Sequence, residues 1–218
     1  MNILIGFEES GTIREAFRKR GHNAWSCDLQ PARDGSKFHI QGDIYDAIDN
    51  PEKYCGAKKW DLIILHPECT AMTVAGNHVY AKGKPKHYKR LEAIEFTEKL
   101  WNHAVEKCEK VVLENPQGVL HTNTDLPKPQ YIQPYEFGED ASKKTGLTLH
   151  NLPRLKSTQR IEGRIVEWPK GSGKMVERWS NQTDSGQNIL GPSPTRARDR
   201  SKTYDGIGDA MADQWGEI

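Results

Sequence analysis

The sequence predicts an α/β fold with a mostly parallel sheet and helices on both faces. Short apolar runs alternate along the chain with segments of helical periodicity, which is the pattern of βαβ units. The clearest run, at 60–65, is almost continuously apolar, as expected of a strand that is buried on both faces. A polar residue closely follows most of these runs. The length of 218 residues suits one domain.

The first half of the chain contains four predicted strands and one helix. Residues 2–6 form an apolar run that ends in Gly6. A helix is expected next, with Ser10 or Thr12 as its cap and Gly21 at its close. The further strands are 23–27, ending at Asp28, the weaker 37–40, ending near Asp43, and 60–65, stopped by Pro67.

The second half begins with a long amphipathic helix at 88–107 and a strand at 110–113. Glu114-Asn115-Pro116 is expected to end this strand, and another strand is predicted at 145–150. Residues 122–130 and 156–200 have loop composition, and a short helix closes the chain at 204–215. The predicted helix faces consist of Leu91, Ile94, Leu100, Trp101 and Val105 in the first helix, and of Ile207, Met211 and Trp215 in the second.

Composition excludes several classes of protein. Six Trp, seven Tyr and five Phe are too many for a disordered chain, although 28% of the residues are charged. The longest aliphatic run is only 62–65, which excludes a membrane span, and the N-terminus lacks the basic region of a signal peptide. Four cysteines without a CxxC pair predict a reduced, cytoplasmic compartment.

The formal net charge of +1 conceals an uneven distribution. Residues 140–204 contain 13 Lys and Arg against 6 Asp and Glu, a net charge of +7, and residues 70–90 add five Lys and Arg. A basic segment on a nearly neutral body favours a polyanion as partner, and 70–90 has the composition of a basic loop that closes over phosphates. A solvated surface loop is the alternative interpretation of both segments.

Acidic residues follow the first three strands. Gly6 to Gly11 is not a GxGxxG loop, and its Glu8 and Glu9 would repel a pyrophosphate. An acidic turn suits a cationic or hydroxyl-bearing ligand such as S-adenosylmethionine, with Asp28 on the ribose and Asp43 near the adenine amine. Taken singly, each acid is typical of a cap or a turn.

Cys69 follows the central strand in the sequence His66-Pro67-Glu68-Cys69-Thr70. Its polar surroundings favour an exposed nucleophile, whereas the other three cysteines are expected to be buried apolar residues. His66-x-Glu68 matches half of a zinc deaminase signature, but the P-C-x-x-C half is missing, and no metal site is predicted. Glu114 would face Cys69 across the cleft if their strands are neighbours, where a carboxyl group can protonate a ring nitrogen.

Together these residues resemble the DNA cytosine-5 methyltransferases, and more closely the short phage-type members. Pro67-Glu68-Cys69 stands where the family has Pro-Pro-Cys, and Glu114-Asn115-Pro116 where it has Glu-Asn-Val. The supporting matches, in the family's order over nearly the whole chain, are Ile5-Gly6-Phe7…Gly11, Asp28, Asp43, Phe137-Gly138, Lys143-Lys144-Thr145 and Gly206 to Ala210.

The resemblance implies a Rossmann-like class I methyltransferase fold and methylation of cytosine C5 in DNA, in phage biology or restriction-modification. It implies S-adenosyl-L-methionine as cofactor and DNA as partner, bound by 140–204 and 70–90. The implied catalytic residues are Cys69, Glu114, Lys143 and Lys144. The implied cofactor-binding residues are Phe7, Glu8, Gly11, Thr12, Asp28, Leu29, Asp43, Ile44, Pro67 and Gly208.

The chain departs from the family pattern at several positions. Glu8-Glu9 replaces glycines, Thr70 replaces glutamine, and Lys143-Lys144 replace arginines, which loses bidentate geometry. The predicted division is a catalytic core at 1–150, a recognition segment at 151–203 and a C-terminal helix at 204–218. Because that segment is short, a free pyrimidine nucleotide is a second candidate substrate, and a catalytically silent nucleic-acid-binding relative is a third interpretation.

Overall fold

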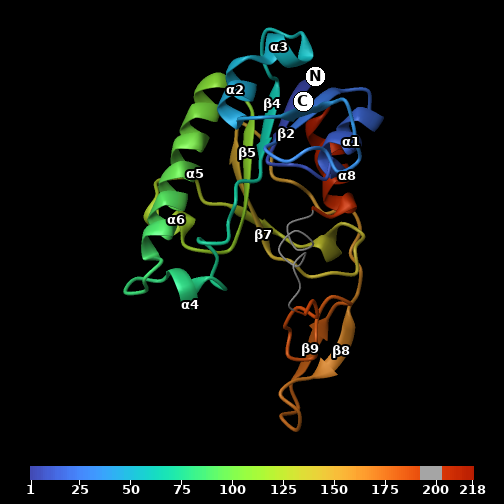
Figure 1. Cartoon of the computed structure of the whole chain (residues 1–218). Coiled ribbons are helices and arrows are strands. Elements are labelled where there is room, and N and C mark those ends of the chain that lie inside the picture. Colours follow the sequence, from blue (N-terminus) through green and yellow to red (C-terminus); the bar gives the residue numbers. More distant parts are fainter. Residues whose placement is uncertain (192–202) are drawn as a thin grey trace.

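The computed structural model describes residues 1–191 and 203–218, and its main feature is a seven-stranded sheet (Figure 1). The strand order is β3-β2-β1-β4-β5-β7-β6. Strands β1 to β5 are parallel, whereas β7 runs antiparallel to both of its neighbours. The strands are β1 Asn2–Gly6, β2 Asn23–Asp28, β3 His39–Gln41, β4 Leu62–Leu65, β5 Val111–Pro116, β6 Gln130–Ile132 and β7 Thr145–His150. The predicted mostly parallel α/β sheet is confirmed.

Helices cover both faces of the sheet, as Figure 1 shows. Helices α1 (Thr12–Lys19) and α8 (Asp205–Trp215) pack on one face, and α2 (Ile44–Asp49) and α5 (His87–Lys107) pack on the other. The shorter helices are α3 Pro51–Cys55, α4 Asn77–Tyr80, α6 Leu120–Asn123 and a 3-10 turn at Pro134–Glu136.

Each central strand contributes side chains to both apolar cores. In β1, Ile3 and Ile5 belong to the core beneath α1 and α8, and Leu4 belongs to the core beneath α2 and α5. In β4 all four side chains, Leu62 to Leu65, are fully buried. Burial on both faces explains why this strand is a continuous apolar run in the sequence.

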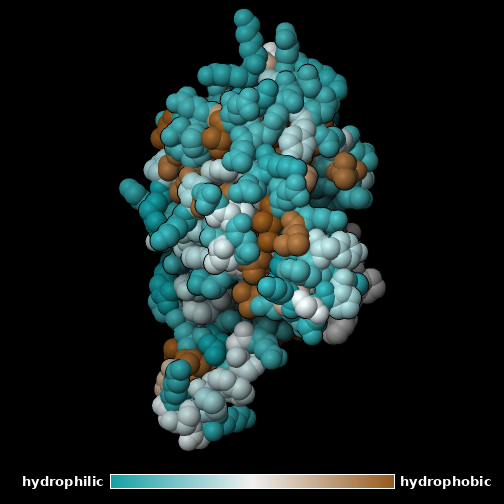
Figure 2. Space-filling view, turned by 90° about the vertical axis from the view of Figure 1, so that its left-hand side faces the viewer, coloured by the Kyte–Doolittle hydropathy of each residue, from teal (hydrophilic) through white to brown (hydrophobic). Residues whose placement is uncertain are grey.

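A two-stranded hairpin of β8 (Arg164–Glu167) and β9 (Met175–Arg178) projects from one end of the body (Figures 1 and 2). At its base Trp179 is buried and stacks on Tyr135, with ring centroids 3.8 Å apart. The sequence did not predict this hairpin. Ile165 and Met175 are about 60% exposed, so its strands lack the apolar alternation that a buried face would impose.

Four local predictions need correction. Strand β5 does not end before Glu114 but continues to Pro116, because Glu114 and Pro116 pair with β7. Leu91 of α5 is 54% exposed rather than part of the buried face. Neither Ser10 nor Thr12 caps α1, whose N-cap is Gly11. Helices α2, α3, α4 and α6 and strand β6 occupy segments where no regular structure was expected.

The surface on the α5 side is mainly hydrophilic, with apolar side chains gathered in patches (Figure 2). Among the helices that the structure describes, none is long and apolar enough to cross a membrane. Residues 192–202, which carry part of the predicted basic segment 140–204, lie outside the described residues. The division at 150/151 and 203/204 stays a prediction.

Candidate active site

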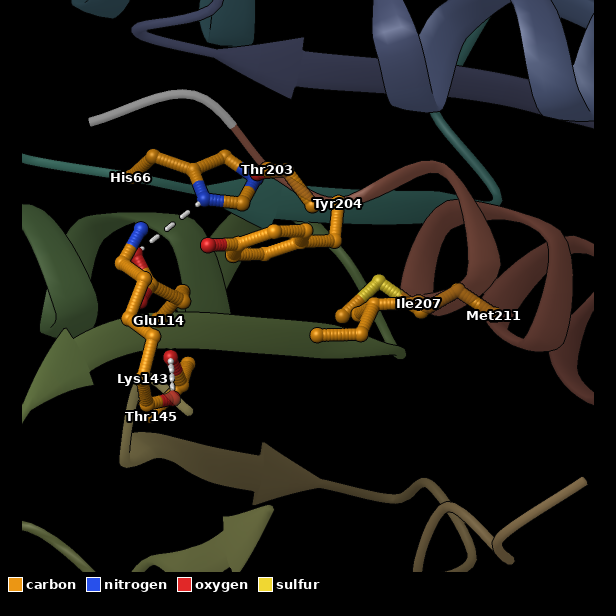
Figure 3. Close-up of a pocket in the computed structure, with 8 residues that line it drawn as sticks. All are labelled: His66, Glu114, Lys143, Thr145, Thr203, Tyr204, Ile207 and Met211. Atoms are coloured by element: carbon orange, nitrogen blue, oxygen red, sulfur yellow. Dashed lines mark hydrogen bonds and ion pairs between the residues drawn. The ribbon is translucent and has the colours of Figure 1, made fainter. Parts of the chain in front are cut away.

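A small pocket opens at the carboxyl edge of β4 and β5, where the N-terminal end of α8 approaches the sheet (Figure 3). His66 follows β4, and its backbone N–H donates to the Gly6 carbonyl at 3.1 Å, which keeps it beside β1. Glu114 lies in β5, which pairs in parallel with β4. The pocket is lined by His66, Glu114, Lys143, Thr145, Thr203, Tyr204, Ile207 and Met211.

Glu114 is the acid of this pocket, and its side chain is only 17% exposed. His66 Nδ1 lies 3.4 Å from Glu114 Oε2. Burial on its own raises the pKa of Glu114, but the contacts with His66, Lys143 and Thr145 together hold that pKa below its ordinary value. The carboxyl group is therefore ionised at neutral pH in the free protein.

Cys69 lies in the turn that follows β4, close to the same charges. Its carbonyl accepts from the N–H groups of Met72 and Thr73, at 2.8 and 3.1 Å, which closes the turn. Burial raises the pKa of the Cys69 thiol to about 11; Glu114 raises it further, whereas Lys143 lowers it. Because Glu114 and Lys143 both act on this thiol, the structure brings the predicted nucleophile and the predicted acid to one site, as adjacent parallel strands require.

Alkylation of Cys69 is expected to be slow at neutral pH and to accelerate as pH rises. With a pKa of about 11, roughly one thiol in 10³ is ionised at about pH 8. Lys143→Met should slow the reaction further, since it removes the positive charge that lowers the pKa. The measurement is site-resolved labelling with iodoacetamide, read by peptide mass spectrometry. Lys144→Met is the matched control, and a Cys69 that labels as fast as a free thiol would contradict the described environment.

The structure separates the two predicted catalytic lysines. Lys143 lines the pocket, whereas Lys144 is exposed and its Nζ lies 4.5 Å from the centroid of the Tyr131 ring. Both lysines directly precede β7, and of the two only Lys143 lines the pocket.

Glu8, predicted to bind cofactor, holds the start of α1. Its carboxylate accepts from the N–H groups of Ile13 at 2.6 Å and Arg14 at 3.2 Å, and its side chain is buried. Burial raises the pKa of Glu8, opposed by these hydrogen bonds and by His66. A carboxylate is stabilised at a helix N-terminus, which explains on structural grounds why Glu8 stands in the turn before α1. Glu9 forms an ion pair with Arg33.

Asp28 and Asp43 lie at the carboxyl ends of β2 and β3, close to each other. Gly42 N–H donates to the Asp28 carbonyl at 3.0 Å. Asp43 caps α2 by accepting from Tyr45 N–H at 2.8 Å, and one Asp28 oxygen accepts from Gln30 N–H at 2.9 Å. Each acid therefore also has the turn or cap role that its residue type suggested.

Apolar residues from the predicted cofactor set surround this edge. Phe7 follows β1 with a φ of 62°, a left-handed conformation that is uncommon outside glycine. Its ring contacts Phe96 edge-on, with centroids 6.2 Å apart. Ile44 is buried behind Gly6, and Leu29 is 72% exposed. Strained backbone and an exposed leucine at a sheet edge are features that accompany ligand sites.

The remaining predicted cofactor residues lie at the start of α1, in the contact between α1 and α8, or in the turn after β4. Gly11 adopts a φ of 74°, and a Cβ there would lie 2.2 Å from the Arg14 guanidinium. Gly208 of α8 packs against Thr12, so that an added Cβ would sit 3.6 Å from the threonine methyl. Pro67 directly follows His66.

Sequence reasoning missed four polar residues of this site. His66 was considered only as half of a metal motif, and Thr145, Thr203 and Tyr204 were not assigned to the pocket. Figure 3 shows the Tyr204 hydroxyl pointing toward Glu114 and His66. The signal available for His66 was its place directly after the central strand, where parallel sheets bind ligands.

Solved structures resemble this chain in fold, whereas no protein-family model and no curated protein matches its sequence. A methyltransferase of Entamoeba histolytica, EhMeth, superposes with a TM-score of 0.50 at 13% identity, over 74% of this chain and 58% of that chain. The S. pombe Dnmt2 methyltransferase gives a TM-score of 0.41 at 17% identity, over 67% of this chain and 48% of that chain. The chain thus spans little more than half the length of the first. With the strand order above, the protein has a Rossmann-like class I methyltransferase fold.

Proposed function

We propose that the protein transfers a methyl group from S-adenosylmethionine to C5 of cytosine in DNA, through a covalent adduct between Cys69 and C6 of the base. The observation that carries the proposal is the shared environment of Cys69, Glu114 and Lys143 at the carboxyl edge of β4 and β5. A thiol, a buried acid and a cation are the groups that addition to a pyrimidine ring needs.

The chemistry assigns a role to each of these groups. The Cys69 thiolate forms a bond to C6, and N3 takes up a proton by way of Glu114, which leaves C5 electron-rich. The bound cofactor supplies the methyl group that C5 takes. A base then takes the C5 proton, and the electron pair of the C5–H bond forms the C5–C6 double bond. The S–C6 bond breaks, N3 returns its proton to Glu114, and the thiolate is restored. Lys143 stabilises the thiolate, because its positive charge lowers the pKa of Cys69. In a duplex the base must leave the stack to reach this pocket.

The edge formed by β1, β2 and β3 has residues that fit the cofactor. Asp28 has one oxygen engaged in a turn, and its second oxygen can accept from ribose hydroxyls. Phe7, Ile44 and Leu29 offer apolar contacts for the adenine ring. Glu8 has no cofactor contact in this proposal, because its carboxylate already accepts hydrogen bonds from the first turn of α1.

The projecting hairpin favours DNA over a free nucleotide. Arg160 and Arg164 of this segment are paired with carboxylates, whereas Lys170 and Lys174 lie exposed at the hairpin tip. Among the described residues no ion pair involves either tip lysine. A single nucleotide phosphate needs one or two cations, while a strand of DNA can contact cations along an extended arm.

Incubation with labelled S-adenosylmethionine tests the proposal. One reaction contains DNA and a second contains dCMP, and the products are digested and analysed as nucleosides. Labelled 5-methylcytosine from DNA supports the proposal. Faster methylation of dCMP than of any DNA would identify a nucleotide enzyme. If the chain binds DNA and transfers no methyl group to either substrate, it is a silent relative.

DNA binding is expected to weaken steeply with salt, by about 0.7–0.9 log units of affinity per phosphate contact for each log unit of salt. Lys170→Glu with Lys174→Glu should lower the affinity and make the salt dependence shallower. Lys58→Glu with Lys59→Glu, at the opposite end of β4, is the control with the same change of charge. Fluorescence anisotropy over a salt series measures both quantities. A flat profile in the unchanged protein would contradict binding through the phosphate backbone.

A further inference from the structure

His66 interacts with two acids, Glu114 within β5 and Glu8 just after β1. Its Nδ1 is 3.4 Å from Glu114 Oε2, on the side of β5. On the side of β1 it interacts electrostatically with the buried carboxylate of Glu8. The His66 side chain is only 10% exposed, and within the described part of the chain its Nε2 has no hydrogen-bond partner.

The state of Glu114 leaves the proposed reaction short of a proton. The carboxyl group is ionised in the free protein, because His66, Lys143 and Thr145 stabilise its charge. A carboxylate facing N3 of cytosine can only accept, and the N3 lone pair also only accepts, so the two repel each other. Addition of the thiolate to C6 needs a proton on N3, and Glu114 must first receive that proton from a neighbour.

We propose that His66 delivers this proton to Glu114 and recovers it at the end of the reaction; the inference rests on the function proposed above. As the S–C6 bond forms, Nδ1 of the doubly protonated imidazole gives its proton to Glu114, and Glu114 gives one to N3. As the S–C6 bond breaks, N3 returns a proton to Glu114, and Glu114 returns one to Nδ1. The relay neither gains nor loses a proton over one turnover.

The geometry favours His66 over the other groups that face Glu114. Lys143 acts electrostatically on both the acid and the thiol and lowers the pKa of Cys69, a role that requires it to keep its charge. Burial raises the pKa of the Tyr204 hydroxyl, which also interacts with Asn181. Glu8 is buried and hydrogen-bonded to the start of α1. His66 combines a contact of 3.4 Å between Nδ1 and Glu114 Oε2 with a second nitrogen inside the site that has no partner among the described residues.

The test compares His66→Asn with the unchanged protein in single-turnover adduct formation on DNA that contains 5-fluorocytosine. Asparagine places an amide donor near the position of Nδ1 but cannot release a proton at working pH. His66→Gln, whose amide lies nearer the position of Nε2, is measured in parallel as a second variant. His103→Gln is the matched control, because His103 Nε2 contacts Asp49 Oδ1 at 2.9 Å on the outer surface.

The expected result is a slower variant that added imidazole rescues. In both His66 variants the adduct rate should be lower by about 10²-fold or more. Free imidazole, which can carry the proton to Glu114, should restore part of that rate. Affinity for S-adenosylmethionine should be unchanged, and His103→Gln should behave as the unchanged protein does.

Two results would overturn the inference while leaving the proposed function intact. One is a His66→Asn variant with the original rate. The other is a slower variant that added imidazole does not rescue, because His66 would then only hold Glu114 in place. If the unchanged protein forms no adduct, the proposed function fails and this inference fails with it.

Discussion

Replacing Cys69 by serine is expected to abolish turnover while affinity for S-adenosylmethionine stays within about threefold. The hydroxyl of serine is a far weaker nucleophile toward C6 than a thiolate, because its proton is lost far less readily. In the proposed function, the cofactor binds at the edge of β1 to β3, away from the thiol. Methyl transfer to DNA and calorimetric titration with the cofactor measure the two effects.

Cys55→Ser is the matched control for this variant. Cys55 is half-buried at the end of α3, beyond the end of the sheet opposite to the site, and should be replaced without loss of activity. A Cys69→Ser protein with full activity would remove Cys69 from the mechanism. A large loss of cofactor affinity would mean that the turn after β4 also shapes the cofactor site.

Glu114→Gln is expected to lower turnover by about 10²–10⁴-fold, the usual contribution of a general acid. The same change removes a negative charge that raises the pKa of Cys69, so the thiol should become more reactive toward iodoacetamide. A variant with lower turnover and faster alkylation of Cys69 would show that Glu114 acts on the cytosine ring and does not activate the nucleophile. Turnover and alkylation rates, measured on the same preparation, provide both values.

Glu95→Gln serves as the control for the loss of a carboxylate, because Glu95 pairs with Lys99 on the exposed side of α5. Its turnover and its thiol reactivity should equal those of the unchanged protein. If Glu114→Gln kept normal turnover, the acid would have no part in the reaction. If turnover and thiol reactivity fell together, Glu114 would act through Cys69 rather than through the base.

The sequence predicted the buried part of the fold well. Strand β4 is apolar at all four positions, and α8 repeats apolar residues at helical spacing, so their patterns identify them. The β8–β9 hairpin could not be predicted in this way, since its strands bury little. The continuation of β5 through Asn115 and Pro116 depends on pairing with β7, a contact between residues far apart in the chain.

The part of the candidate site that follows from strand order was predicted from the sequence. Placing Cys69 and Glu114 after adjacent strands was enough to expect them at one cleft. The separation of Lys143 from Lys144 and the cap formed by Glu8 depend on side-chain directions that residue types alone do not determine. His66 emerged only when its distance to Glu114 and its unpartnered Nε2 were known.

The measurement that tests the central claim most directly is the trapping of a covalent complex on DNA that contains 5-fluorocytosine, with S-adenosylmethionine present. Fluorine at C5 cannot leave as a proton does, so the S–C6 bond persists after methyl transfer. Peptide mass spectrometry is expected to find one methylated nucleotide attached to Cys69. The absence of a covalent complex, or attachment at Cys27, Cys55 or Cys108, would contradict the account.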